Sequence, residues 1–162
     1  MTKKINSKDK VITYFKGNTE NLLKFASHWV DSETGEQIKL SSGFKDYYRY
    51  RLAGYRYNVK MGTPYTESHQ RVADMLGISF ETIKKNYQPL LARMGLIHTM
   101  DASEKGKAYY IVDDPQLSKG EWINPKLKKY LDKREFEKPE NYESTFEYKN
   151  LMILEHNKRL AH

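Results

Sequence analysis

The segment from residue 68 to residue 94 constrains the fold more than any other part of this 162-residue chain. Ser68 is of the residue type that caps the start of a helix by accepting a hydrogen bond from a free amide. Small and apolar side chains then recur at helical spacing, at Val72, Ala73 and Leu76. Gly77 follows where the chain must leave the helix in a left-handed conformation, which costs a residue with a Cβ about 1 kcal/mol or more. The sequence therefore predicts a helix that ends in a tight turn at Gly77.

A second helix is predicted to begin directly after this turn. Ile78 is expected to fill the angle between the helices, and Ser79 to cap the second one. Its buried face continues with Ile83, Tyr87, Leu90 or Leu91, and Met94. The side chains that remain facing outward are Phe80, Glu81, Lys84, Lys85 and Gln88. Pro89 lies inside this helix, where a proline removes a backbone hydrogen bond, so we expect a bend there.

A β-hairpin is predicted after the second helix. Residues 97–100 and 108–112 have strand composition and are joined by the polar tip 101–107. The spacing of Ala73, Gly77, Ile78, Ser79 and Ile83, followed by Gly95-Leu96-Ile97, resembles the winged helix-turn-helix superfamily over residues 41–112. That resemblance implies that the second helix enters a DNA major groove and that the hairpin reaches the adjacent backbone. A helical hairpin packed inside an unrelated domain is the alternative.

Residues 42–57 are predicted to form the first helix of this core. Aromatic and apolar positions recur there on successive turns, at Phe44, Tyr47 or Tyr48, Arg51 or Leu52, and Tyr55. We expect the tyrosines to pack inward, while Arg49, Arg56 and Lys60 contact solvent or phosphates. In the alternative interpretation, the interleaved tyrosines and arginines stack on the bases of a single-stranded nucleic acid.

The N-terminal part is predicted to be a basic arm followed by a β-hairpin. Residues 1–9 have the composition of a flexible arm, and residues 10–15 have strand composition. Residues 23–30 and 37–40 flank a polar, glycine-bearing connection, which is typical of a hairpin. A short helix over residues 20–25 is the competing interpretation.

The C-terminal part is predicted to be a helical extension. A short helix is expected over residues 122–131, and Ser144 with Glu147 forms a capping box that begins a closing helix. This closing helix, residues 144–160, either forms a homodimer surface or folds back onto its own domain. The predicted fold class is therefore α+β and mainly helical, with an N-terminal β-hairpin and a C-terminal helical extension. Its predicted parts are residues 1–40, 41–112 and 113–162.

Composition limits the function classes. The chain has no cysteine, which excludes disulfides and cysteine-based zinc sites. The aliphatic run 151–154 is too short to cross a bilayer, so we expect a cytoplasmic, nucleoid-associated protein with no membrane partner. The net charge is +7, and residues 1–60 hold twice as many Lys and Arg as Asp and Glu. Such an excess favours phosphate contacts, although a solvated basic terminus explains the first lysines equally well.

No spacing in the sequence predicts catalysis. The chain has neither a phosphate-binding glycine loop nor a His-Glu-x-x-His motif, so we expect no enzyme, metal, cofactor or small-molecule ligand. His69 and His98 lie beside the predicted DNA surface and are interpreted as an ordinary helix-start histidine and an ordinary strand histidine.

These observations predict a sequence-specific protein that binds double-stranded DNA. The overall pattern is similar to small phage and plasmid proteins that regulate transcription, and a role in replication initiation is the alternative. A winged-helix protein-interaction module is a further alternative. The residues predicted to contact DNA are Ser68, His69, Ser79, Phe80, Glu81, Thr82, Lys84, Lys85 and Gln88 on the helices, and Lys105 and Lys107 on the hairpin.

Overall fold

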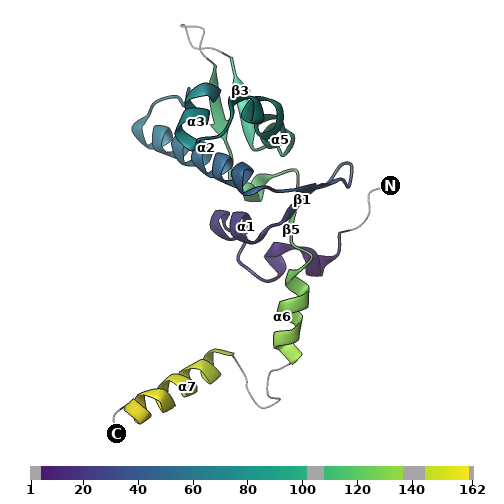
Figure 1. Ribbon diagram of the computed structural model, residues 1–162, viewed down its shortest axis with the longest axis vertical. Helices are drawn as coiled ribbons and strands as arrows, with labels where there is room; N and C mark the ends of the chain where they lie inside the picture. The colour runs from purple at the N-terminus through teal and green to yellow at the C-terminus, as the bar shows by residue number, and fades with distance from the viewer. Residues whose placement is uncertain (1–4, 102–107, 137–144, 161–162) are drawn as a thin grey trace. The chain divides into compact units, whose positions relative to one another are not determined.

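The computed structural model describes residues 5–101, 108–136 and 145–160 (Figure 1). It has the α+β, mainly helical composition that was predicted, with small antiparallel sheets. The chain forms two compact units, Met1–Pro125 and Lys126–His162. The predicted domain boundaries at residues 40 and 112 stay a prediction. The first compact unit extends past residue 112 and includes a strand at Gly120–Ile123.

A three-stranded sheet organises the N-terminal part of the first unit. Strands β1 (His28–Asp31) and β2 (Gln37–Lys39) form the predicted hairpin, with Trp29 opposite Ile38. Strand β5 (Gly120–Ile123) pairs with the other edge of β1, so the strand order is β2-β1-β5. Trp122 and Ile123 therefore belong to a strand, and the prediction that they begin a helix is wrong. The pairing with β1, ninety residues earlier in the chain, buries both side chains, which explains the difference.

The segment before this hairpin contains short helical turns. The predicted strand at residues 10–15 is wrong, because the chain forms 3₁₀ turns η1 (Ser7–Asp9) and η2 (Val11–Thr13), and Lys10 makes a single β-bridge to Ile123. The turn buries Val11 completely and leaves Ile12 exposed. Helix α1 (Thr19–Phe25), capped by Asn18, is the competing helix of the sequence analysis, so the first hairpin strand begins later than residue 23.

The helices around Gly77 begin and end at the capping residues that the sequence predicts. Helix α2 (Ser42–Met61) precedes α3 (His69–Leu76), and Ser68 accepts a hydrogen bond from the backbone N–H of Arg71. Gly77 ends α3 with φ 65°, in the left-handed region, as predicted. Ser79 then accepts a hydrogen bond from the N–H of Thr82. In Figure 1, α2 lies between α1 and the helices that follow it.

The second predicted helix changes its hydrogen bonding halfway along. Helix α4 (Phe80–Thr82) continues into the π-helical turn η3 (Ile83–Tyr87) and then into α5 (Gln88–Arg93). In η3 the N–H of Gln88 donates to the carbonyl of Ile83, five residues earlier. A proline has no N–H, and in a regular α-helix its ring would collide with the carbonyl four residues before it. A π turn widens the helix at this place and so makes room for the ring. The disturbance expected at Pro89 is therefore a π turn just ahead of it.

The predicted hairpin after this helix is confirmed. Strands β3 (Ile97–Met100) and β4 (Tyr109–Val112) pair antiparallel, with Ile97 opposite Val112. A further 3₁₀ turn, η4 (Pro115–Leu117), leads to β5. Side chains from the helices and both sheets form the core of the unit, and the largest that are fully buried include Trp29, Tyr47, Ile83, Leu91 and Met94.

The second unit consists of two helices within the described residues. Helix α6 (Leu127–Phe136) begins five residues later than predicted, and α7 (Thr145–Leu160) matches the predicted closing helix. The capping residue Ser144 lies outside the described residues. Apolar side chains of α7 are exposed, at Met152, Ile153, Leu154 and Leu160. None of the helices in the described part of the chain has the length and apolar character needed to span a membrane.

Candidate nucleic-acid interface

Polar side chains on the first turns of the second helix form an exposed row. It consists of Ser79, Glu81, Lys84 and Lys85, all of which are exposed. Ile83 lies on the opposite side with no exposed surface and anchors the helix in the core. Glu81 and Lys85 form an ion pair of 3.0 Å, whereas no carboxylate among the described residues pairs with Lys84. The exposed row therefore presents hydroxyl, carboxylate and ammonium groups together.

Gln88 does not belong to this exposed row, and the prediction that it faces outward is wrong. Its Oε1 atom accepts a hydrogen bond from the hydroxyl of Tyr47, a fully buried residue of α2. The π turn is the physical reason, because one additional residue in the turn rotates everything after it by about 100°. Pro89 takes the outward position in its place and is exposed.

Two further predicted residues lie beside the exposed row. Thr82 is half-buried, and its hydroxyl lies 2.8 Å from that of Ser79. The ring of Phe80 is half-buried between the ring of His69, at a centroid distance of 6.5 Å, and the ammonium of Lys84, at 5.8 Å. Ser68 is exposed at the start of α3. The predicted hairpin contacts Lys105 and Lys107 lie outside the described residues.

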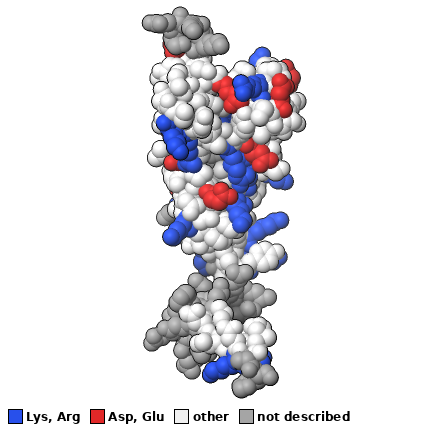
Figure 2. Space-filling model, turned by 90° about the vertical axis from the view of Figure 1, so that its left-hand side faces the viewer, with Lys and Arg blue, Asp and Glu red and all other residues white. Residues whose placement is uncertain are grey.

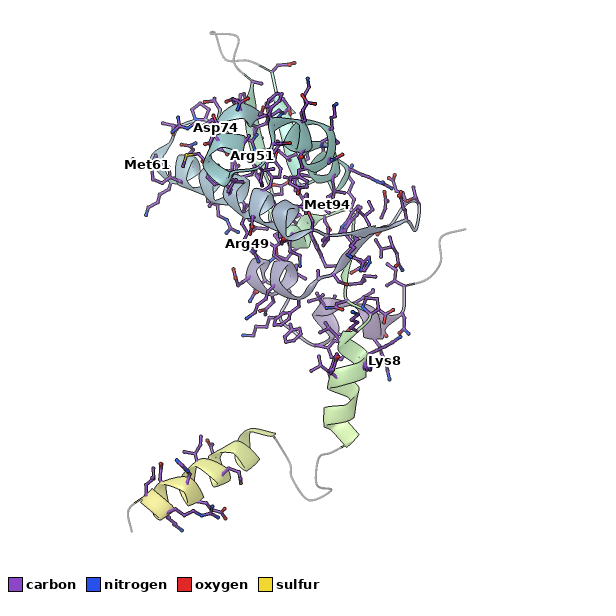
Figure 3. All side chains as sticks on the ribbon, in the orientation of Figure 1. Lys8, Arg49, Arg51, Met61, Asp74 and Met94 are labelled. Atoms are coloured by element: carbon purple, nitrogen blue, oxygen red, sulfur yellow. The ribbon has the colours of Figure 1, made fainter. Side chains whose placement is uncertain are left out.

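A buried arginine connects the elements that surround this row. Arg51 has no exposed surface, although it lies on the middle of α2, where that helix passes α3 (Figure 3). Its guanidinium donates hydrogen bonds to the backbone carbonyl of Glu67 at 2.7 Å and to the Tyr47 hydroxyl at 3.1 Å. The ring of Tyr110 on β4 lies 4.9 Å from its Cζ atom. Arg51 therefore contacts α3, β4 and, through Tyr47, the second helix.

Two tyrosine hydroxyls near Arg51 donate hydrogen bonds to the carboxylate of Glu67. Tyr65 accepts a hydrogen bond from Arg51 at 3.4 Å and donates one to Oε1 of Glu67 at 3.0 Å, while Tyr50 donates to Oε2 at 2.5 Å. Burial raises the pKa of Tyr65, so its hydroxyl keeps the proton that it donates. Helical spacing predicts Arg51 or Leu52 on the inward face, but it does not indicate this network. The sequence feature that points to the network is an arginine at helical spacing from tyrosines that are buried.

His69 accepts a hydrogen bond from the same arginine. Its Nδ1 atom lies 2.8 Å from the Nη2 donor of Arg51, and because a guanidinium cannot accept, Nδ1 accepts the hydrogen bond. Burial, together with the charges of Arg51 and Lys84, lowers the pKa of His69 below its ordinary 6.5. The His69 ring also stacks on Tyr110 at a centroid distance of 6.1 Å. The residue is therefore neutral at neutral pH and contributes no positive charge to the interface.

The free energy of unfolding should decrease as the pH falls below 6.5, in part because of His69. The unfolded chain takes up a proton on this residue at a higher pH than the folded chain does, so the loss begins near 6.5 and is complete below the folded pKa. Urea unfolding of the wild type and of His69→Gln at about pH 7.5 and about pH 5.5 measures this contribution. The wild type should lose more stability than the variant, and identical losses would contradict the assignment.

An ion pair fixes the end of the second helix to the N-terminal hairpin. Arg93 on α5 donates to the carboxylate of Asp31 at 2.9 Å and to that of Glu36 at 2.7 Å. The N–H of Glu33 donates to Asp31 as well, and these hydrogen bonds lower the pKa of Asp31. This link joins residues 62 positions apart in the chain, and nothing in the local sequence indicated it.

Several Lys and Arg side chains of the basic N-terminal part already bind other groups of the same chain. Arg56 forms an ion pair with Asp114, and Lys10 lies 3.5 Å from Glu121. Lys45 donates to the backbone carbonyl of Ala26 at 2.5 Å, and burial lowers its pKa. Figure 2 shows one face of the molecule, on which Lys and Arg are interspersed with Asp and Glu. The charge excess of the sequence therefore overstates the number of cations that are free to contact phosphates.

His98 and an open groove are further features of the residues that the structure describes. His98 on β3 lies 3.1 Å from the carboxylate of Asp113, which is the ordinary strand position that was expected. An open groove of about 760 Å³ lies between α2, the loop before α3 and β4, with Tyr57, Tyr65 and Tyr110 in its walls. In the described ranges, His, Asp and Glu side chains nowhere gather in the groups of three or more that a metal ion would need.

Comparison with protein families gives a match over the middle of the chain. The sequence profile of a family described as "Domain of unknown function (DUF6945)" matches residues 24–106, just over half of the chain. The matched region runs from the end of α1 through the exposed row and β3. No curated protein matches the chain in sequence.

Proposed function

We propose that this chain, which belongs to the family described as Domain of unknown function (DUF6945), is a transcription regulator that binds double-stranded DNA in a sequence-specific manner. The observation that carries the proposal is the exposed row, which lies on a helix that begins at Phe80, three residues after the left-handed Gly77. A helix in this position, followed by a β-hairpin, is the arrangement of a winged helix-turn-helix. A B-DNA major groove about 12 Å wide admits such a helix.

The chemistry of the exposed row suits base edges and phosphates. An ammonium donates to guanine O6 and N7, and a carboxylate accepts from cytosine N4, so Lys84 and Glu81 suit opposite members of a G·C pair. Hydroxyls such as those of Ser68 and Ser79 contact phosphate oxygens in many complexes. In this proposal the phosphate contacts set the register and the row selects the sequence. The ion pairs of Arg93 join the end of this helix to the β1–β2 hairpin.

Fluorescence anisotropy with the full chain tests the proposal. The three probes are a duplex from upstream of the protein's own coding sequence, a scrambled duplex and a single strand, each at two salt concentrations. The upstream duplex should bind about a thousandfold more tightly than the scrambled one. Binding should also weaken steeply with salt, because phosphate contacts release counterions. Equal, weak binding to all three probes would reject the proposal, and preference for the single strand would favour the stacking interpretation.

Replacing Lys84 by alanine should reduce discrimination between the upstream and scrambled duplexes by about 1 to 3 kcal/mol. Lys84 is the lysine of the exposed row that no described carboxylate neutralises, so its donors are available for a base. Lys39→Ala is the matched control, because Lys39 is an exposed lysine on β2. Titration of both duplexes with both variants gives the ratio of affinities. An unchanged ratio for Lys84→Ala would mean that this lysine does not contact a base.

A further inference from the structure

Phe80 is the apolar residue within an otherwise polar helix start. Its neighbours Ser79 and Glu81 are exposed, as is Lys84 one turn later, whereas the ring of Phe80 is half-buried. Because Phe80 is half-buried, part of its apolar side chain stays in contact with water at the border of the exposed row. Because the Phe80 ring lies beside the exposed row, a molecule that binds to the row would also contact this ring.

The ring of Phe80 is held by a series of contacts that starts at buried Arg51. Arg51 donates to His69 at 2.8 Å, and the centroid of the His69 ring lies 6.1 Å from that of Tyr110 and 6.5 Å from that of Phe80. The centroid of the Phe80 ring also lies 5.8 Å from the ammonium nitrogen of Lys84. The protein therefore presents a positioned apolar ring and a hydrogen-bond donor side by side.

We propose that Phe80 contacts the 5-methyl group of a thymine in the major groove, an inference that rests on the proposed DNA-binding function. Thymine is the base that presents a methyl group and, next to it, the O4 acceptor in that groove. The Phe80 ring matches the methyl group. One of the three N–H donors of Lys84 matches O4, which leaves the others for a guanine of the neighbouring base pair. Phe80 is thus a residue that determines specificity for a T·A pair, beyond the polar contacts of the exposed row.

Replacing thymine by deoxyuridine tests this pairing directly, because it removes the methyl group and leaves every hydrogen-bonding atom in place. The probe is the duplex most enriched from a random pool by the full-length protein, with its thymines replaced one at a time. One replacement should weaken wild-type binding about fourfold, the effect of a single buried methyl group. In Phe80→Ala the same replacement should change the affinity by less than about twofold.

The control variant is Leu117→Ala, which removes an exposed apolar side chain on the turn before β5. It should keep the full wild-type response to deoxyuridine. A wild-type scan in which no replacement matters would overturn the inference without any variant, as would a full response in Phe80→Ala or an enriched duplex that lacks thymine. If the protein enriches no duplex at all, the proposed function is wrong, whereas an enriched duplex without thymine dependence overturns only the role of Phe80.

Discussion

Replacing Arg51 by methionine should lower the free energy of unfolding by about 3 kcal/mol. Methionine approaches the length of arginine but has no donors, so the Glu67 carbonyl, the Tyr47 hydroxyl and Nδ1 of His69 would each lose the hydrogen bond that Arg51 donates. Each buried acceptor left without a donor costs about 1 to 3 kcal/mol before the surroundings relax. The loss should also loosen β4, since Tyr110 packs against the guanidinium.

Arg49→Met is the matched control for this experiment. Arg49 lies on the same helix, its side chain is 39% exposed, and its ion pair with Asp46 is long at 3.5 Å. Such surface pairs contribute little, so the variant should stay within about 0.5 kcal/mol of the wild type. Urea unfolding followed by the fluorescence of Trp29 and Trp122, both buried, reports the stability of the sheet and its surroundings. Equal losses in both variants would mean that the Arg51 network is not a stabilising centre.

Replacing Gly120 by alanine should lower the free energy of unfolding by at least about 2 kcal/mol. Gly120 is the first residue of β5, and a Cβ there would collide with the backbone carbonyl of Val30 and lie 2.5 Å from the ring of Trp29. Neither neighbour yields easily, because one is backbone in the middle of a sheet and the other is a fully buried indole. The strand pairing between β1 and β5 would have to open to admit the methyl group.

Gly17→Ala serves as the comparison for this change. Its Cβ would lie 3.2 Å from the side chain of Ile12, which is 53% exposed and can move aside. The variant should therefore change stability by less than about 1 kcal/mol. Thermal unfolding of both variants separates a local steric effect from the general cost of a glycine substitution. A small loss for Gly120→Ala would mean that β5 does not pack closely on β1.

Local signals in the sequence accounted for the helix ends and the turn between them. Ser68, Gly77 and Ser79 act through hydrogen bonds and backbone conformations within four residues, which a sequence displays directly. Burial of Ile83 followed from helical spacing in the same way. For the candidate site, Glu81, Lys84 and Lys85 are exposed as predicted, whereas Phe80 is only half-buried. The prediction fails at Gln88, because a π turn changes the phase of the helix without changing its apolar pattern.

Contacts between distant segments account for most of what the sequence did not predict. Nothing near Gly120 indicates that it pairs with Asp31, and nothing near Arg93 indicates its two carboxylate partners. The network around Arg51 likewise joins α2 to residues 65–69 and to β4. Such pairings depend on the whole packing of the unit, so periodicity and caps indicate the elements but not which of them meet.

The closing of the N-terminal sheet by β5 determines which truncations of the chain can keep their core. A fragment that stops at residue 106, where the family match ends, or at residue 112 would leave the inner strand β1 without its second neighbour. Its backbone groups and the indole of Trp29 would then meet water or another molecule, and unprotected strand edges promote aggregation. The shortest expression fragment that retains the sheet therefore extends through Ile123.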